Sequence, residues 1–158
     1  MKKVLIAYYS RAGNTEKMAE YIAEGVRFSG NQAVLKKVSD IKKAEDLAGY
    51  DGYIFGSPTY FLDAPEPVKM FLFLAQKAEL KGKLGGAFGS YTHDGNAAGM
   101  VFDTMQHVYN MEPFELGAFK LKEHELAIFD QKQATLEQTE GMRACQSYGK
   151  VFGEKLGK

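Results

Sequence analysis

The sequence predicts an α/β fold in three layers, with a five-stranded parallel sheet covered by helices on both of its faces. The first observation behind this prediction is that short apolar runs alternate with segments of helical periodicity along the chain. Strands separated by helices pair in parallel and are buried on both faces of their sheet. The second observation is that 158 residues without an internal repeat or a low-complexity linker fit one domain, which we expect to span residues 1–158.

Five segments are expected to be strands. The first of them contains the apolar run Val4-Leu5-Ile6-Ala7. Gly85 and Gly86 weaken the prediction for the fourth strand, because glycine has no side chain to pack in a sheet. In chain order, the expected strands are 3–9, 33–38, 52–56, 84–89 and 114–121.

The remaining segments show helical patterns. Residues 15–28 place Met18, Ile22 and Val26 on one face, and Pro65 and Pro67 mark a helix start, where a missing N–H costs little. The other expected helices are a weak one at 41–47, one continuing from Pro65 through Val68, Phe71, Leu72 and Ala75, one at 95–109 with Val101, Met105 and Val108 facing inward, and one at 135–156. Segment 122–133 stays open between an extension of the fifth strand, an extra strand at 126–129 and a surface loop.

The composition argues against several classes of function. Twenty basic and twenty acidic residues cancel, which gives no support to binding of nucleic acid or of an anionic membrane. No apolar run has the length of a membrane-spanning helix and the N-terminus does not resemble a signal peptide, so we expect a cytoplasmic protein. The single cysteine, Cys145, excludes an internal disulfide, and its spacing predicts a buried, inert thiol on the apolar face of a helix.

The segment from Tyr8 to Thr15 joins the first strand to the first helix and predicts a phosphate-binding loop. Such a turn presents backbone N–H groups and the positive end of the helix dipole at one point. Ser10 and Thr15 add hydroxyl donors, and Gly13 lets the backbone approach a ligand closely. The same residue types also occur in ordinary turns. Neither G-x-x-x-x-G-K-[ST] nor a G-x-G-x-x-G after this strand is present, which argues against ATP and NAD sites of those kinds.

Two further loops follow the carboxyl ends of predicted strands, where open parallel sheets bind their ligands. The loops at 57–63 and 90–96 carry aromatic side chains beside backbone amides. With the strands in the order 2-1-3-4-5, the first, third and fourth are neighbours, so the three loops converge. Together they suit a ligand with a phosphate at one end and a flat polar ring system at the other.

The three segments are YYSRAGNTEKMAEYIAEG from Tyr8, GSPTYF from Gly56 and GSYTHDG from Gly89, and together they resemble the flavodoxin-like FMN-binding family. The likeness covers nearly the whole chain in element order, and it is closest to flavodoxins and to the flavodoxin module of flavodiiron proteins. It implies one bound FMN, no metal and no catalytic side chain. By position it implies phosphate contacts from Ser10, Arg11, Ala12, Gly13, Asn14 and Thr15, and contacts to the isoalloxazine from Ser57, Pro58, Thr59, Tyr60, Phe61, Ser90, Tyr91, Thr92, His93, Asp94 and Gly95.

The chain also departs from this family. Ala12 stands where a threonine is common, which removes one phosphate donor. Many flavodoxins are strongly acidic, whereas this chain is neutral, so electrostatic docking to basic partners is not expected. Residues 59–64 contain no glycine, and among them we expect only Asp63 to tolerate a positive φ. Asp63 is either a turn residue or a group that tunes the flavin potential.

The other polar candidates have simpler interpretations. His93 is a solvated loop residue, an acid or a substrate contact, whereas Asp94 is expected to cap the following helix. His107 and His124 lack partners at metal-ligand spacing and are expected at the surface. A receiver domain is excluded because Tyr8 and Tyr9 replace its acidic cluster, and a low-molecular-weight phosphatase is excluded because the first loop lacks C-x5-R.

The resemblance implies an FMN-binding carrier that exchanges electrons with redox partner proteins by transient docking. We expect a monomer or a small homo-oligomer. The alternative is an enzyme, an NAD(P)H-dependent quinone reductase. A second alternative is a cofactor-free interaction module on the same scaffold.

Overall fold

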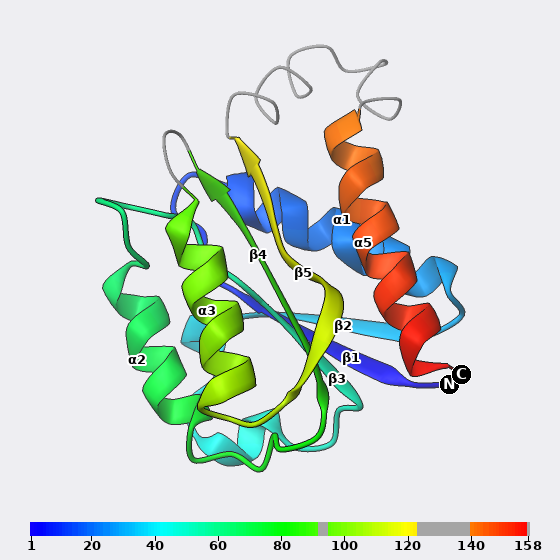
Figure 1. Cartoon of the computed structure of the whole chain (residues 1–158), viewed down its shortest axis with the longest axis horizontal. Helices are drawn as coiled ribbons and strands as arrows, with labels where there is room; N and C mark the ends of the chain where they lie inside the picture. Colours follow the sequence, from blue (N-terminus) through cyan, green and yellow to red (C-terminus); the bar gives the residue numbers. More distant parts are fainter. Residues whose placement is uncertain (92–94, 123–139, 158) are drawn as a thin grey trace.

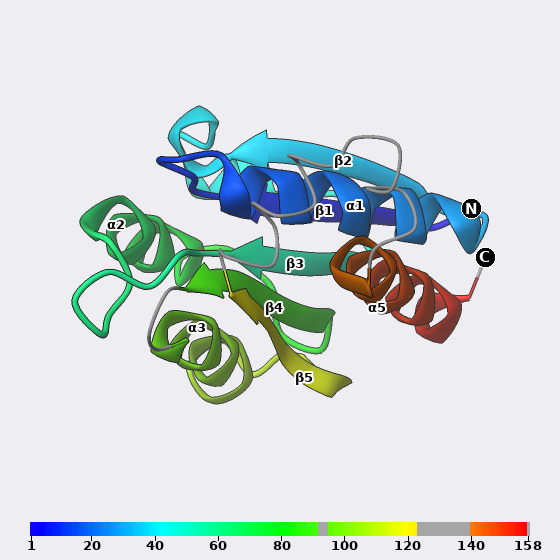
Figure 2. The same ribbon diagram turned by 90° about the horizontal axis from the view of Figure 1, so that it is seen from above.

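The computed structural model of the chain describes residues 1–91, 95–122 and 140–157. Its five parallel strands form one sheet in the order β2-β1-β3-β4-β5, as the sequence predicts. Helices cover both faces, with α1 and α5 on one side and α2 and α3 on the other (Figures 1 and 2). The strands are β1 (Lys3–Tyr8), β2 (Gln32–Lys37), β3 (Gly52–Gly56), β4 (Leu84–Tyr91) and β5 (Glu112–Lys122). The helices are α1 (Asn14–Phe28), α2 (Glu66–Ala75), α3 (Asn96–His107) and α5 (Glu140–Leu156).

The sheet divides the apolar core into two clusters, because successive residues of a strand point to opposite faces. In β1, Val4 and Ile6 are buried against α1 and α5, whereas Leu5 and Ala7 belong to the cluster on the α2–α3 side. Met18, Ile22 and Val26 of α1 are fully buried, as their spacing predicts.

Helices α1 and α5 pack backbone against backbone. A Cβ atom built on Gly25 of α1 would lie 1.9 Å from the carbonyl oxygen of Gln146 in α5. A Cβ atom built on Gly149 of α5 would lie 2.0 Å from the carbonyl oxygen of Ile22 in α1. Both distances are far below van der Waals contact, so only glycine allows this approach.

The pairing of β4 with β5 contains a shift in register. Gly85 pairs with Pro113, whereas Ala87 pairs with Ala118, so residues 114–117 of β5 stand opposite a single residue of β4. The hydroxyl group of Tyr148 in α5 fills the interrupted ladder. It lies 3.1 Å from the amide nitrogen of Ala87 and 2.7 Å from the carbonyl oxygen of Gly117.

Several local predictions are corrected. The expected helix at 41–47 is instead two short 3₁₀ segments, η1 (Val38–Asp40) and η2 (Ala44–Leu47). Val108, expected to face inward, follows the end of α3 and is 49% exposed. The open segment at 122–133, beyond Lys122, and the start of the helix expected at 135–156 lie outside the described residues.

Candidate functional site

The carboxyl ends of β1, β3 and β4 meet at one edge of the sheet, where backbone hydrogen bonds join the loops that follow them. The amide of Tyr9 donates to the carbonyl of Gly56 at 3.2 Å, which links the first loop to β3. The amide of Thr59 donates to the carbonyl of Ser90 at 3.2 Å, which links the second loop to β4. The expected convergence of these segments is confirmed.

The first loop leads directly into the N-terminus of α1. Gly13 has φ 94°, in the left-handed region that favours glycine, and its amide donates to the hydroxyl oxygen of Ser10 at 3.1 Å. Gly13 is the N-cap residue and has no side chain with which to cap the helix. The first-turn N–H groups, from Asn14 onward, have no acceptor within the helix. Arg11 and Ala12 are exposed beside this end.

Two buried hydroxyl groups connect the first loop to the end of β4. Thr15 Oγ1 and Ser90 Oγ lie 2.8 Å apart, and each residue is only 1% exposed. Because a hydroxyl both donates and accepts, either group can be the donor in this pair. The pair fixes the position of the α1 N-terminus relative to the central strands.

The second loop begins with three buried residues. The hydroxyl of Ser57, which is fully buried, donates to the carbonyl of Pro58 at 2.8 Å. The hydroxyl oxygen of Thr59 accepts a hydrogen bond from the amide of Ala97 at 3.1 Å. Ala97 lies in the first turn of α3, so Thr59 satisfies one of the amides that this helix end leaves open.

Residues 60–63 form a tight hairpin, in which the backbones of Tyr60 and Asp63 exchange two hydrogen bonds of 2.8 and 3.0 Å. Phe61 and Leu62, at its tip, have φ values of 52° and 67°. The prediction that only Asp63 would tolerate a positive φ here is therefore wrong. Two consecutive left-handed residues make the tight turn that short hairpins favour, and the surrounding contacts impose it on side chains that rarely adopt it.

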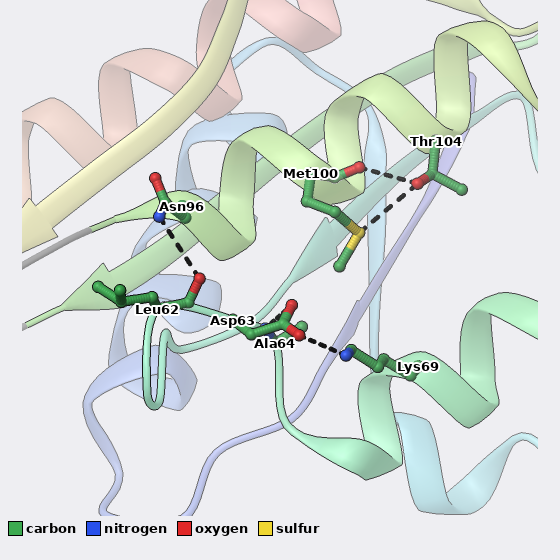
Figure 3. Close-up of polar contacts among 7 residues, drawn as sticks. All are labelled: Leu62, Asp63, Ala64, Lys69, Asn96, Met100 and Thr104. Atoms are coloured by element: carbon green, nitrogen blue, oxygen red, sulfur yellow. Dashed lines mark hydrogen bonds and ion pairs between the residues drawn. The ribbon is translucent and has the colours of Figure 1, made fainter.

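The contacts that hold this hairpin come from both neighbouring helices (Figure 3). The side-chain amide of Asn96 in α3 donates to the carbonyl of Leu62 at 3.4 Å. The carboxylate of Asp63 forms an ion pair with Lys69 of α2 and accepts from the amide of Ala64 at 2.7 Å. Lys69 and this amide lower the pKa of the Asp63 carboxyl group. These contacts assign Asp63 a role in fixing the hairpin.

The third segment differs from its prediction. Ser90 and Tyr91, expected in a loop, are the last residues of β4, because they pair with Leu121 and Lys122 of β5. Gly95 is buried and precedes α3. Thr92, His93 and Asp94 lie outside the described residues.

Cys145 and His107 do not belong to this edge of the sheet. Cys145 is fully buried, and burial raises the pKa of its thiol to about 12, so the group stays protonated near neutral pH and is a poor nucleophile. His107 is exposed, as expected, and His124 lies outside the described residues. Within the described ranges, no cluster of His, Cys, Asp and Glu could hold a metal ion, and no helix is long and apolar enough to cross a bilayer.

A groove beside this site was not predicted. It has a volume of about 950 Å³ and runs between α2 and residues 37–45, reaching Ser10 at the start of the first loop. We call it the α2 groove. The sequence holds one signal of it, since Met70 and Phe73 lie on the side of α2 that the inward pattern leaves exposed.

The donor set of the first loop fits a phosphate group. Uncapped amides at a helix N-terminus, a left-handed glycine and hydroxyl groups are the donors that bind such anions. Among the described residues, nothing lies within 4 Å of a Cβ atom built on Gly13, so the backbone is accessible there. The half-buried aromatic rings of Tyr60 and Tyr91 provide surfaces for a flat ring.

Comparison with known sequences gives matches over much of the chain. Residues 6–137 match the profile of the family described as Flavodoxin. A flavodoxin from Clostridium saccharobutylicum is 38% identical over 88 residues, which cover 56% of this chain and 55% of that protein. An NAD(P)H dehydrogenase (quinone) from Cupriavidus metallidurans is 34% identical over 57% of this chain and 57% of that protein. The match thus spans a little over half the length of these curated relatives.

Solved structures share the architecture over nearly all of the chain. A flavodoxin from the domain Archaea superposes with a TM-score of 0.80 at 23% identity, with 99% of both chains covered. The flavodiiron core from Synechocystis sp. superposes with a TM-score of 0.78 at 25% identity, over 98% of this chain and 36% of that chain. Both likenesses support the three-layer fold with strand order 2-1-3-4-5.

Proposed function

Because this chain belongs to the flavodoxin family, we propose that it binds one FMN noncovalently and carries electrons between redox partner proteins. Members of this family bind FMN and transfer electrons. The observation that carries the proposal is the N-terminus of α1 behind Gly13, which no side chain of the described residues caps, at the edge of the sheet where β1, β3 and β4 end.

The first loop is proposed to hold the phosphate. The amides at the start of α1 donate to phosphate oxygens, and the hydroxyl of Thr15 and the side chains of Ser10, Arg11 and Asn14 add further donors. Each hydrogen bond to a charged group contributes about 1.5–3 kcal/mol, so a few of them bind the phosphate without a buried lysine. Ala12 contributes only its backbone.

The second and third segments are proposed to hold the isoalloxazine. Ser57, Pro58 and Thr59 place their backbone at the ring, since their own hydrogen bonds fix the loop. Tyr60, Phe61 and Tyr91 would offer their rings to the isoalloxazine, and Ser90, Thr92, His93, Asp94 and Gly95 are proposed to complete the site. When bound, FMN supplies the electron-transfer chemistry, while these residues bind and orient it.

A calorimetric titration with FMN and with riboflavin tests this proposal. FMN is expected to bind tightly and riboflavin weakly, because only FMN carries the phosphate. Equal affinities for the two ligands would remove the first loop from the site. An absence of binding for both would leave the cofactor-free interaction module as the function.

A matched pair of variants locates the phosphate. Thr15→Val is expected to weaken FMN binding about tenfold, because it removes a hydroxyl donor of the first loop together with the bond to Ser90 that positions this helix end. Thr104→Val serves as the control, because the Thr104 hydroxyl bonds to the carbonyl of Met100 within α3, away from the first loop (Figure 3). If both variants bind FMN alike, Thr15 is not a phosphate ligand.

The second candidate function is reduction of quinones by a nicotinamide donor. It is favoured by the 34% identity to an NAD(P)H dehydrogenase (quinone) over 57% of this chain. Turnover of a quinone with NADH or NADPH by the FMN-loaded protein would assign this activity. Without turnover, rapid electron exchange with a redox protein would assign the carrier role.

Compartment, domain organisation and assembly belong to the same proposal. A single buried thiol suits the reducing cytoplasm in which we expect the protein to work. We propose that residues 1–158 form one domain and that the protein is a monomer or a small homo-oligomer. Partners are proposed to dock transiently, because electron carriers need brief contacts of small area.

A further inference from the structure

The α2 groove combines an apolar floor with an exposed apolar rim. Val38, Ile41 and Phe71 are buried beneath it, with exposed fractions of 5–7%. Met70 and Phe73 of α2 stand at its rim and are 60% and 68% exposed. Large apolar side chains at this exposure mark an interaction surface when they gather on one side of a protein.

Further exposed apolar side chains lie on the other side of α2, in the 60–63 hairpin that contacts α3. Among the described residues, eight large apolar side chains are exposed, and four of them, Phe61, Leu62, Met70 and Phe73, belong to the 60–63 hairpin and α2. The hairpin projects beyond the N-terminal end of α2 at the edge of the sheet that carries the proposed cofactor site (Figure 1). The α2 groove itself reaches this edge at Ser10, so a partner seated in it would lie beside the first loop.

The charges around the groove are mostly positive. Its lining includes four lysines and one glutamate, namely Lys37, Lys42, Lys43, Lys77 and Glu45. Asp40 and Asp46 are near but do not line it, and the Asp46 carboxylate accepts hydrogen bonds from the amides of Lys42 and Lys43. Tyr8, which also lines the groove, donates to the Glu16 carboxylate at 2.7 Å, so the excess of lysine belongs to the lining itself.

This charge argues against a second copy of the chain as the occupant. In a two-fold symmetric dimer, the same patch faces itself. The lysines of one copy would then face the lysines of the other, and juxtaposed like charges disfavour association. An occupant with acidic groups around an apolar contact has the complementary surface.

We propose that the α2 groove docks an acidic redox protein, with its carboxylates against Lys42, Lys43 and Lys77 and an apolar side chain against Met70 and Phe73. This inference rests on the proposed carrier function and adds the charge of the partner and the face that it contacts. Contact at Ser10 brings that partner to the edge of the sheet where the flavin is proposed to bind.

Binding to two probes of opposite charge tests the proposal. The probes are an acidic plant-type [2Fe–2S] ferredoxin and a basic cytochrome c, titrated calorimetrically at low and at raised ionic strength. The ferredoxin is expected to bind, and more weakly as salt rises. Failure of the ferredoxin to bind at low salt, or preferential binding of the cytochrome, overturns the proposal.

Charge-reversal variants locate the surface. The triple variant K42E/K43E/K77E is expected to bind the ferredoxin about tenfold more weakly. The control K81E/K150E/K155E makes the same change in net charge at exposed lysines that do not line the groove, and it is expected to bind within about twofold of the wild type. If both triple variants lose the same ferredoxin affinity, the proposal is overturned. It is also overturned if the wild-type protein sediments as a dimer and only the groove variant is monomeric.

A further experiment tests the docking proposal independently of the proposed carrier function. Amide chemical shifts of the labelled protein, recorded without FMN, are expected to change at residues 37–45 and 66–77 when ferredoxin is added. Shifts confined to other surfaces overturn the docking proposal. Electron exchange with ferredoxin is then measured after FMN loading, so that loss of FMN binding removes the exchange and leaves the shifts.

Discussion

The two faces of the sheet are built in opposite ways. On one face, α1 and α5 pack so closely that Gly25 and Gly149 leave no room for a Cβ atom. On the other face, the α2 groove of about 950 Å³ lies between α2 and residues 37–45, and a smaller groove of about 360 Å³ lies between α2 and α3. Met70 and Phe73 are exposed on this second face.

The difference follows from what each face has to hold. The first turn of α1 is part of the proposed phosphate site, so its position has to be fixed. The Thr15–Ser90 hydrogen bond fixes the N-terminal end of the helix, and close backbone packing against α5 holds its C-terminal half. The α2–α3 face is where a partner has room to bind. The helix that begins at the proposed phosphate site is packed tightly, whereas the face that is proposed to meet a partner carries grooves.

The largest change in the free energy of unfolding is expected from replacing glycines by alanine, one on each face of the sheet. Gly149→Ala is expected to destabilise the protein by about 3 kcal/mol, because the new Cβ would overlap the backbone of Ile22. Gly99→Ala in α3 is expected to stabilise it by about 0.5–1 kcal/mol, since alanine favours helices and, among the described residues, nothing lies within 4 Å of the new atom. Denaturant unfolding measures both.

Helix propensity alone predicts that both substitutions stabilise the protein. Opposite signs would therefore support the close α1–α5 packing. Two stabilising results would show that the two helices separate easily, and the contrast between the faces would be lost.

A smaller effect compares two tyrosine hydroxyls. In Tyr148→Phe, the loss leaves the buried amide of Ala87 and the carbonyl of Gly117 without this partner, at a cost of about 2 kcal/mol. In Tyr109→Phe, on the α2–α3 face, only the bond to the carbonyl of Leu72 is lost, at a cost of about 1 kcal/mol. Thermal and denaturant unfolding compare the two, and the reverse order would contradict the role of Tyr148 in the β4–β5 ladder.

The smallest effect on stability is expected at the open face. Met70→Ser and Phe73→Ser remove exposed side chains, so the free energy of unfolding should change by less than about 0.5 kcal/mol. Calorimetric unfolding of each variant provides the measurement. A loss above about 1 kcal/mol would mean that these side chains are packed in the free protein, which would contradict an open groove.

The sequence predicts the fold well because apolar spacing and glycine position largely determine it. The strands at 3–9 and 52–56 and the helix at 15–28 are found to within a residue at each end, since buried runs and turn residues mark them. The convergence of the three loops also follows from the strand order alone.

The missed features depend on contacts between distant residues. Ser90 and Tyr91 have the composition of a turn, and their pairing with Leu121 and Lys122 makes them strand. The left-handed pair Phe61 and Leu62 has no glycine or asparagine signal, and its conformation depends on contacts from α2 and α3. The α2 groove is lined by residues 37–45, where the structure has short 3₁₀ segments and the sequence predicted a helix at 41–47.

The register shift in β5 has a consequence for how the chain tolerates change. Residues 114–117 already form an excursion from the ladder, in which Leu116 is 52% exposed and a Cβ atom built on Gly117 meets none of the described residues within 4 Å. The pairs Gly85–Pro113 and Ala87–Ala118 hold the strand on either side of it. Extra residues placed between 115 and 117 would therefore lengthen a loop and leave both halves of the ladder in register. This excursion is therefore a suitable insertion site, at which a tag or a binding peptide can be placed within β5.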